Sequence, residues 1–142
     1  MERMREQTLA YWMEQYRDKE ALVEEFLETL SVQWHGAHMT VYGTKAIFLE
    51  RASGLKTVFI HYVKASVELS VDPHDPKAFM SLGKCLAIVL TVKREAIHQH
   101  EMHMLLNDAV ATNEIQLSKI RTTLKDAREA HRKTHCQSVV MD

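Results

Sequence analysis

Glycine and proline are scarce in this chain, which has 142 residues but only four glycines and two prolines. Turns between strands draw heavily on these two residues, so a protein built from many short strands would need more of them. The scarcity argues against a sheet-rich fold and favours long helices joined by few connections. We therefore expect an all-α protein.

Long apolar runs and a strong excess of one charge are missing as well. The longest fully apolar run is the six residues 85–90, whereas a membrane-spanning helix needs about 20. The formal net charge is −1, which provides no general attraction to nucleic acid. Cys85 and Cys136 lie far apart and form no disulfide framework. These features predict a soluble, cytoplasmic protein in a reducing compartment, with no nucleic-acid partner.

Motifs that carry catalytic chemistry are absent from the sequence. There is no glycine-rich phosphate loop and no G-x-S-x-G, H-E-x-x-H or C-x-x-C pattern. Cys85 lies within an apolar segment, where a cysteine usually serves as a small core residue. We therefore expect a protein that is not an enzyme, uses no cofactor and has no evident small-molecule substrate.

The apolar residues of the N-terminal segment recur at steps of three, four and seven, which indicates one face of a helix over residues 2–30. Residues 31–43 show no clear period and contain Gly36 and Gly43, so we expect a loop there. Residues 44–70 return to steps of four and three and predict a second helix. A hairpin around Gly54 is the competing interpretation, because residues 57–60 favour strands.

Asp72–Pro76 is the clearest break, since two prolines in five residues cannot continue a helix. From Ala78 onward a four-three spacing persists to His131 and predicts a third helix over residues 77–135. One continuous helix of about 55 residues would be roughly 80 Å long. A break near Asn107 would instead give a four-helix bundle. In both cases we expect one elongated domain over residues 1–135 with coiled-coil-like packing, and a flexible tail at 136–142.

The distal part of the long apolar seam is the predicted partner surface. Short first and second helices would leave it uncovered, and an exposed apolar stripe marks an association site. The candidate contact residues are Val110, Leu117, Ile120 and Leu124. A basic stripe beside the seam would set orientation or contact an acidic partner: Arg121, Lys125, Arg128 and Arg132.

These observations predict a non-enzymatic interaction or scaffold module. We expect it to bind a protein partner of unknown identity and to form a homodimer. Two other classes stay open. An elongated helical dimer could place its basic stripe on an anionic membrane surface. A helical-bundle metal protein could use the Glu95-x-x-His98 spacing or the His131 and His135 pair. Each spacing supplies only two ligands, so no metal site is expected.

Overall fold

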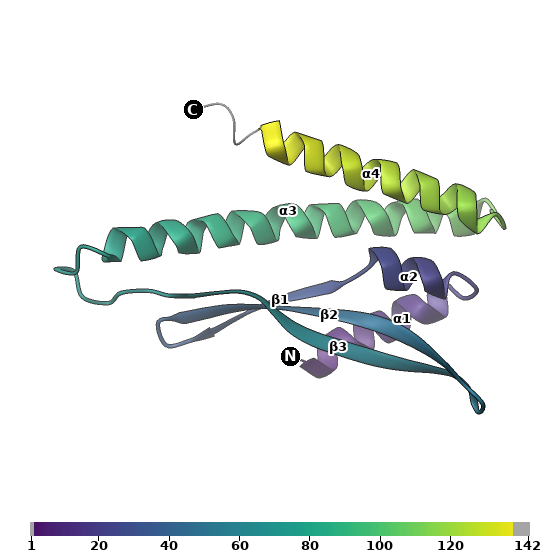
Figure 1. Ribbon diagram of the computed structural model, residues 1–142, viewed down its shortest axis with the longest axis horizontal. Helices are drawn as coiled ribbons and strands as arrows, with labels where there is room; N and C mark the ends of the chain where they lie inside the picture. Colours follow the sequence, from purple (N-terminus) through teal and green to yellow (C-terminus); the bar gives the residue numbers. More distant parts are fainter. Residues whose placement is uncertain (1, 138–142) are drawn as a thin grey trace.

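The computed structural model describes residues 2–137 and overturns the all-α expectation. Helices and an antiparallel sheet of three strands, ordered β1–β2–β3, build the described part of the chain (Figure 1). The elements are α1 (Glu2–Gln15), α2 (Glu20–Phe26), β1 (Thr29–His35), β2 (His38–Arg51), β3 (Gly54–Glu68), α3 (Ala78–Ala111) and α4 (Leu117–Gln137). The expected helical bundle with coiled-coil-like packing is therefore wrong.

The helix expected over residues 2–30 is divided into α1, α2 and the start of β1. Asp18 adopts a left-handed backbone conformation, with φ of 67°, in the turn between α1 and α2. Aspartate tolerates this conformation better than most residues, because its short side chain can bond locally. The chain thus turns without using glycine or proline. The helical spacing of apolar residues continues across the turn because both helices face the same core.

The sheet occupies the region expected to be a loop and a second helix, residues 31–43 and 44–70. Its strands are 7, 14 and 15 residues long, so the meander needs only two tight turns. Gly36 and Gly54 lie at these turns with φ of 60° and 107°, where an L side chain would be strained. The hairpin interpretation around Gly54 is correct. Long strands need few turns, so scarce glycine did not exclude a sheet.

The helix expected over residues 77–135 breaks at Asn113 into α3 and α4. Asn113 has φ of 51°, and its N–H donates to the Val110 carbonyl at 3.2 Å. The N–H of Glu114 donates to the Ala109 carbonyl at 3.0 Å. This pair of bonds is the Schellman arrangement that ends helices, with asparagine in the position that glycine usually takes. The break lies six residues beyond Asn107.

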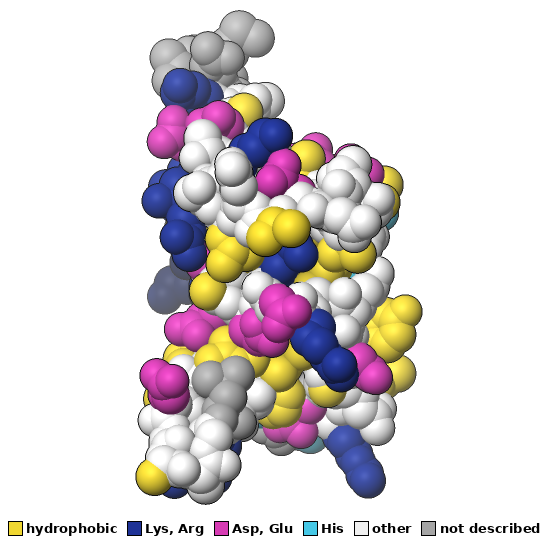
Figure 2. Space-filling view, turned by 90° about the vertical axis from the view of Figure 1, so that its right-hand side faces the viewer, with side chains coloured by type: hydrophobic (Ala, Val, Ile, Leu, Met, Phe, Trp, Pro, Cys, Tyr) yellow, Lys and Arg dark blue, Asp and Glu magenta, His cyan; other side chains and the backbone are white. Residues whose placement is uncertain are grey.

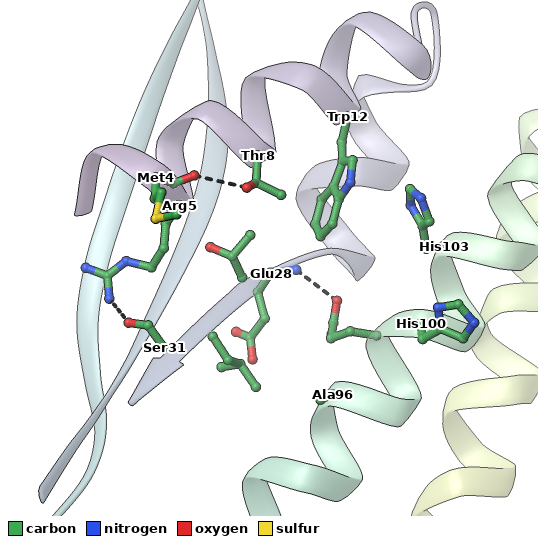
Figure 3. A pocket seen from close by; sticks show the side chains of 12 residues that line it. Met4, Arg5, Thr8, Trp12, Glu28, Ser31, Ala96, His100 and His103 are labelled. Carbon is green, nitrogen blue, oxygen red and sulfur yellow. Dashed lines mark hydrogen bonds between the residues drawn. The ribbon is translucent and has the colours of Figure 1, made fainter. Parts of the chain in front are cut away.

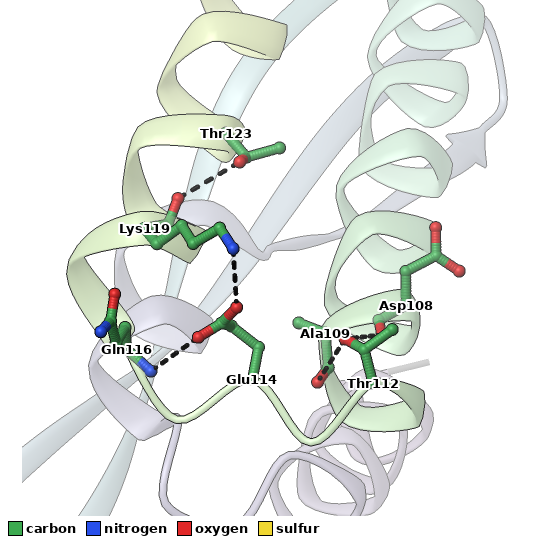
Figure 4. Close-up of polar contacts among 7 residues, drawn as sticks. All are labelled: Asp108, Ala109, Thr112, Glu114, Gln116, Lys119 and Thr123. Carbon is green, nitrogen blue, oxygen red and sulfur yellow. Dashed lines mark hydrogen bonds and ion pairs between the residues drawn. The ribbon is translucent and has the colours of Figure 1, made fainter.

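Glu114 lies just before α4 and bonds to residues at the beginning of that helix (Figure 4). Its carboxylate accepts hydrogen bonds from the Gln116 N–H and from Lys119 Nζ, both at 3.1 Å. The bond from the Gln116 N–H, followed by that from Lys119, lowers the pKa of Glu114. A negative charge at this position also stabilises the positive end of the α4 dipole. The turn therefore fixes α4 antiparallel to α3.

The principal core lies where α1, α2, the second half of α3 and α4 converge. Its buried residues are Tyr16, Leu22, Val23, Phe26, Leu27, Met102, Leu106, Ala109, Ile120 and Leu124. A smaller cluster joins the sheet to the first half of α3 through Met39, Val67 and Cys85, with Ile88 packed against it. Figure 1 shows α4 running back over only the second part of α3.

Within the described residues, no helix combines the length and the apolar character needed to cross a bilayer. The layers are instead those of a sheet covered on one side by helices (Figure 1). Two features follow from this arrangement. A space lies between α1, β1 and α3, and α4 does not reach the first half of α3.

Candidate functional site

Two of the four predicted association residues lie inside the chain's own core. Ile120 and Leu124 are buried against α2 and α3, whereas Val110 and Leu117 are about one-third exposed beside the α3–α4 turn. The sequence places these four residues on one stripe, but α2 folds back to cover half of it. Ile120 and Leu124 thus belong to the chain's own core, whereas Val110 and Leu117 stay predicted association residues.

The basic stripe of α4 faces α2 within the same chain. Arg121 Nε donates to Glu25 Oε2 at 2.9 Å, and Lys125 Nζ lies 4.0 Å from Glu25 Oε1. Arg128 donates to the Glu25 carbonyl at 2.7 Å, and its guanidinium lies 4.3 Å from the Phe26 ring centroid. Arg132 is exposed. Figure 2 shows basic side chains gathered at the height of α4, with acidic side chains between them.

Three of the four weak metal candidates come together between α3 and α4. His98 and His131 stack with ring centroids 4.4 Å apart and planes inclined by 15°, and His131 Nε2 lies 3.9 Å from Glu95 Oε1. Ring-nitrogen lone pairs point along the ring plane, so stacked imidazoles do not converge on one ion. Among the described residues no group of three ligating side chains could hold a metal. The side chain of His135 lies outside the described residues.

A cavity of about 480 Å³ lies between α1, β1 and the middle of α3 (Figure 3). This volume falls within the range of roughly 300–1,000 Å³ that small-molecule sites occupy. Its lining residues are Met4, Arg5, Thr8, Trp12, Glu28, Thr29, Leu30, Ser31, Ala96, Gln99, His100 and His103. Eight of these twelve residues are polar or charged, but most of the surface that they expose to the cavity is apolar.

The two ends of this cavity differ. Figure 3 shows Arg5 and Ser31 at one end and His103 with His100 at the other, with Trp12 above. His103 Nδ1 lies 2.7 Å from the Tyr16 hydroxyl, and its ring centroid is 5.2 Å from that of Trp12. Burial lowers the pKa of His103 and raises that of Tyr16 to about 12, so both stay neutral at pH 7. The paired Tyr16 and His103 side chains are therefore uncharged and in contact with each other.

Two buried polar atoms at the cavity lack hydrogen-bond partners. They are Nε of Arg5 and Oγ1 of Thr29, whose residues are only 9% and 8% exposed. Arg5 donates through Nη1 to the Ser31 hydroxyl and lies over the Tyr42 ring. Buried polar groups in folded proteins are almost always paired. Both atoms are enclosed by the protein beside the cavity.

The part of α3 from Phe79 to Ile97 carries a second candidate surface. Seven large apolar side chains there are exposed: Phe79, Met80, Leu82, Leu86, Val89, Leu90 and Ile97. Phe79 is 88% exposed and Leu86 is 56% exposed. At about 100° per residue, Phe79, Leu86 and Leu90 lie within roughly 20° of one line. This line is opposite the face through which Cys85 and Ile88 contact the sheet. We call these seven residues the uncovered α3 face.

Basic residues flank the uncovered α3 face. Residues 77–94 contain Lys77, Lys84, Lys93 and Arg94, and they contain no acidic residue. Acidic residues stand on both sides of this stretch: Asp72 and Asp75 lie in the loop that precedes α3, and Glu95 follows Arg94 directly. The Asp75 carboxylate accepts from the Lys77 N–H and the Ser70 hydroxyl, and the former bond chiefly lowers its pKa. Each end of the surface thus carries charges of both signs, with Asp72, Asp75 and Lys77 before it and Lys93, Arg94 and Glu95 near its other end.

Comparison with known proteins adds no assignment, because no family model, curated protein or solved structure matches this chain. The function therefore has to be argued from these surfaces alone.

Neither candidate surface was found from the sequence. The lining of the cavity comes from three separated segments, and no local motif connects them. The uncovered α3 face did leave a signal, because residues 78–92 are apolar on all sides of a helix and carry Lys84 as their one charge. A helix of this kind is normally buried all round. The spacing alone suggested instead a single seam that continued toward Leu124.

Proposed function

We propose that this protein is a non-catalytic interaction module that pairs with a second copy of itself through the uncovered α3 face. The single observation that carries the proposal is the group of seven exposed large apolar side chains on one helix. Scattered exposed apolar residues are ordinary, but contiguous ones mark association sites. This proposal keeps the self-association expected from the sequence and moves it from the distal seam to the start of α3.

The size of the uncovered α3 face fits a protein interface. The seven exposed fractions together correspond to about four fully exposed large side chains, on the order of 700 Å² at ~150–200 Å² each. The largest apolar patch on a typical monomer is roughly 300–600 Å². A standard interface buries about 800 Å² on each partner. The face is therefore large for a monomer and close to what a dimer requires.

The shape and charge of the face suit an antiparallel pair. A two-fold axis near Leu86 would place Lys93 of one copy opposite Phe79 of the other, about one helical turn along the axis from the Asp72–Asp75 loop. A two-fold interface needs this kind of self-complementary surface. Gly83 and Ala87 lie on the exposed part of α3, and nothing in the chain approaches the Cβ position of Gly83 within 4 Å. Small residues here permit close helix approach.

Light scattering coupled to size-exclusion chromatography tests the proposal, with Leu86→Glu beside the wild type. The wild type is expected to elute as a dimer at tens of micromolar, and Leu86→Glu as a monomer, because a charge in an apolar interface stays unpaired. Ile115→Glu is the matched control. Ile115 is 88% exposed in the α3–α4 turn, away from the face, so this variant should remain dimeric.

A monomeric wild type across this concentration range would overturn the proposal. Equal loss of the dimer in Ile115→Glu would show that added negative charge, and not the position on α3, controls assembly. Circular dichroism and thermal unfolding of each variant should match the wild type at low concentration, since Leu86 contributes little to the monomer core. A folded, monomeric Leu86→Glu is therefore the supporting result.

A second candidate is favoured by the charge of the same segment. Residues 77–94 carry four bases and no acid around an apolar surface, a pattern typical of helices that lie on anionic membranes. Sedimentation with vesicles of phosphatidylcholine, with and without phosphatidylserine, separates the two functions. Binding that requires the anionic lipid and disappears at high salt would favour the membrane surface. A dimer that ignores both vesicle types favours self-association.

A further inference from the structure

We propose that the cavity between α1, β1 and α3 binds a small amphipathic carboxylate, with Arg5 holding the carboxylate and the apolar lining holding the chain. This function is separate from self-association, because the cavity uses Ala96 to His103 on α3 and the uncovered α3 face lies mostly before it. The proposal rests on an unbalanced buried charge beside an apolar space of suitable size.

The charge of Arg5 carries the first step. Arg5 is only 9% exposed, and none of the described carboxylates lies within ion-pair distance of its guanidinium. Burying a charge without a counter-charge is costly, so buried arginines usually meet an anion. Ser31 and the Tyr42 ring contact the guanidinium, but neither supplies negative charge. An anionic ligand would supply it.

The acidic residue of the cavity lining, Glu28, already has a positively charged partner. The Glu28 carboxylate accepts hydrogen bonds from the Tyr62 hydroxyl and from Lys64 Nζ, both on β3. The backbone N–H of Glu28 donates to Gln99 Oε1 at 3.0 Å, which ties β1 to α3 across the cavity. Glu28 and Lys64 balance each other, so Arg5 sets the net charge of the site. A cationic ligand would be repelled.

The shape of the Arg5 guanidinium favours a carboxylate as the head group of the ligand. The planar guanidinium matches a carboxylate in two parallel hydrogen bonds, and Nε is the donor left without a partner. The hydroxyl of Thr29 is the second unpartnered group at the cavity and would donate to the same head group. Met4, Leu30 and Trp12 then offer apolar contacts to the chain. This combination describes a short fatty acid better than a sugar or a nucleotide.

Decanoate and decanol form a matched pair of probes, since they share a chain and differ in the charged head. Trp12 lines the cavity, and Trp34 is the other tryptophan of the sequence. In the Trp34→Phe protein, the tryptophan fluorescence therefore comes from Trp12 alone. Below the concentration at which decanoate forms micelles, we expect a saturable change in Trp12 fluorescence. A bond to a charged group predicts that decanoate binds about 10- to 100-fold more tightly than decanol.

Variants then locate the site. Arg5→Met keeps the length of the side chain and removes its charge, so decanoate should bind 10- to 100-fold more weakly while decanol changes by less than about twofold. Ala96→Phe should block both probes by filling the cavity. Leu86→Glu is the control, because it alters the uncovered α3 face and should leave binding unchanged.

Equal affinity for decanoate and decanol in the otherwise native protein would overturn the proposal, and this comparison needs no change at Arg5. A loss of both probes in folded Arg5→Met would also overturn it, since it would assign Arg5 a role in shape and not in charge recognition. Absence of any saturable signal at Trp12 would remove the site altogether. Loss of the dimer with intact decanoate binding would separate this site from the proposed function.

Discussion

The two halves of α3 differ more in burial than in composition. Residues 78–94 are the more apolar half, yet Cys85 is the one fully buried residue among them. Residues 95–111 are more polar, and they bury His98, Met102, Leu106 and Ala109. The difference arises because α1, α2 and α4 all converge on the second half, whereas the sheet alone reaches the first half.

Burial in this molecule is therefore decided by which elements reach a side chain, and not by its hydrophobicity alone. The second half of α3 is complete within the monomer, with even a histidine enclosed. The first half keeps an apolar surface that the monomer does not use. Substitutions of the same kind in the two halves should have different effects, and this contrast can be measured.

The largest difference is expected between Leu106→Ala and Leu86→Ala. Leu106 is completely buried in the principal core, so its truncation leaves a cavity and should lower the free energy of unfolding by about 3–5 kcal/mol. Leu86 has few neighbours in the monomer, so its truncation should cost less than about 1 kcal/mol. Urea unfolding at a concentration low enough to populate the monomer measures both values.

The same two variants should reverse their order in an association assay. Leu86→Ala should weaken dimer formation, while Leu106→Ala should leave the uncovered α3 face unchanged. If Leu86→Ala cost as much stability as Leu106→Ala in the monomer, the first half of α3 would belong to an internal core. The comparison between the halves would then fail.

The spacing of apolar residues predicted helical structure near both ends of the chain, although it missed the breaks within those helices. Between them, where the spacing was ambiguous, it predicted a helix in place of strands. Between residues 44 and 70, steps of three and four coincide by chance with apolar positions on both faces of two long strands. The β-branched residues Thr57, Val58 and Ile60 favoured the extended form, and the turn at Gly54 required positive φ. Local preference was the better guide there, and periodicity was the worse one.

The candidate sites were harder to predict for a physical reason. Arg5 becomes a buried charge only because β1 and β2 bring Ser31 and Tyr42 beneath α1. Such contacts join residues that are far apart in sequence, and no spacing reports them. The break at Asn113 is similar, because asparagine replaced the glycine that usually ends a helix. It turned the predicted seam inward and left the start of α3 uncovered.

A smaller, pH-dependent effect is expected at His98, where the second half of α3 meets α4. Burial, followed by the charge of His131, lowers the pKa of His98 below its usual 6.5. The unfolded chain therefore binds more protons, and stability should fall as the pH drops below about 6.5. The charged groups facing His98 are His131 and Arg128 on α4 and Glu95 and Glu101 on α3. Urea unfolding between pH 7.5 and 5.5 measures this loss.

His98→Leu should flatten that pH dependence without abolishing it, because burial also lowers the pKa of His103. His74→Leu is the control, since His74 is exposed in the loop before α3 and its replacement should leave the slope unchanged. Identical slopes for His98→Leu and the wild type would show that His98 does not link this interface to pH.

The smallest expected effect is at Gly83 in the first half of α3. A larger residue there should stabilise the monomer but weaken self-association. Gly83 lies in the first half of α3 with open space around its Cβ position, so Gly83→Ala should stabilise the monomer by about 1 kcal/mol through helix propensity. Gly83→Leu should stabilise the monomer similarly yet weaken self-association, because a larger side chain separates the paired helices. Gly43→Ala is the opposite control: its added Cβ would meet the Tyr62 ring at 2.6 Å and should destabilise the monomer. If Gly83→Leu left the dimer intact, the two helices would not approach each other at Gly83, and the antiparallel pairing near Leu86 would have to be abandoned.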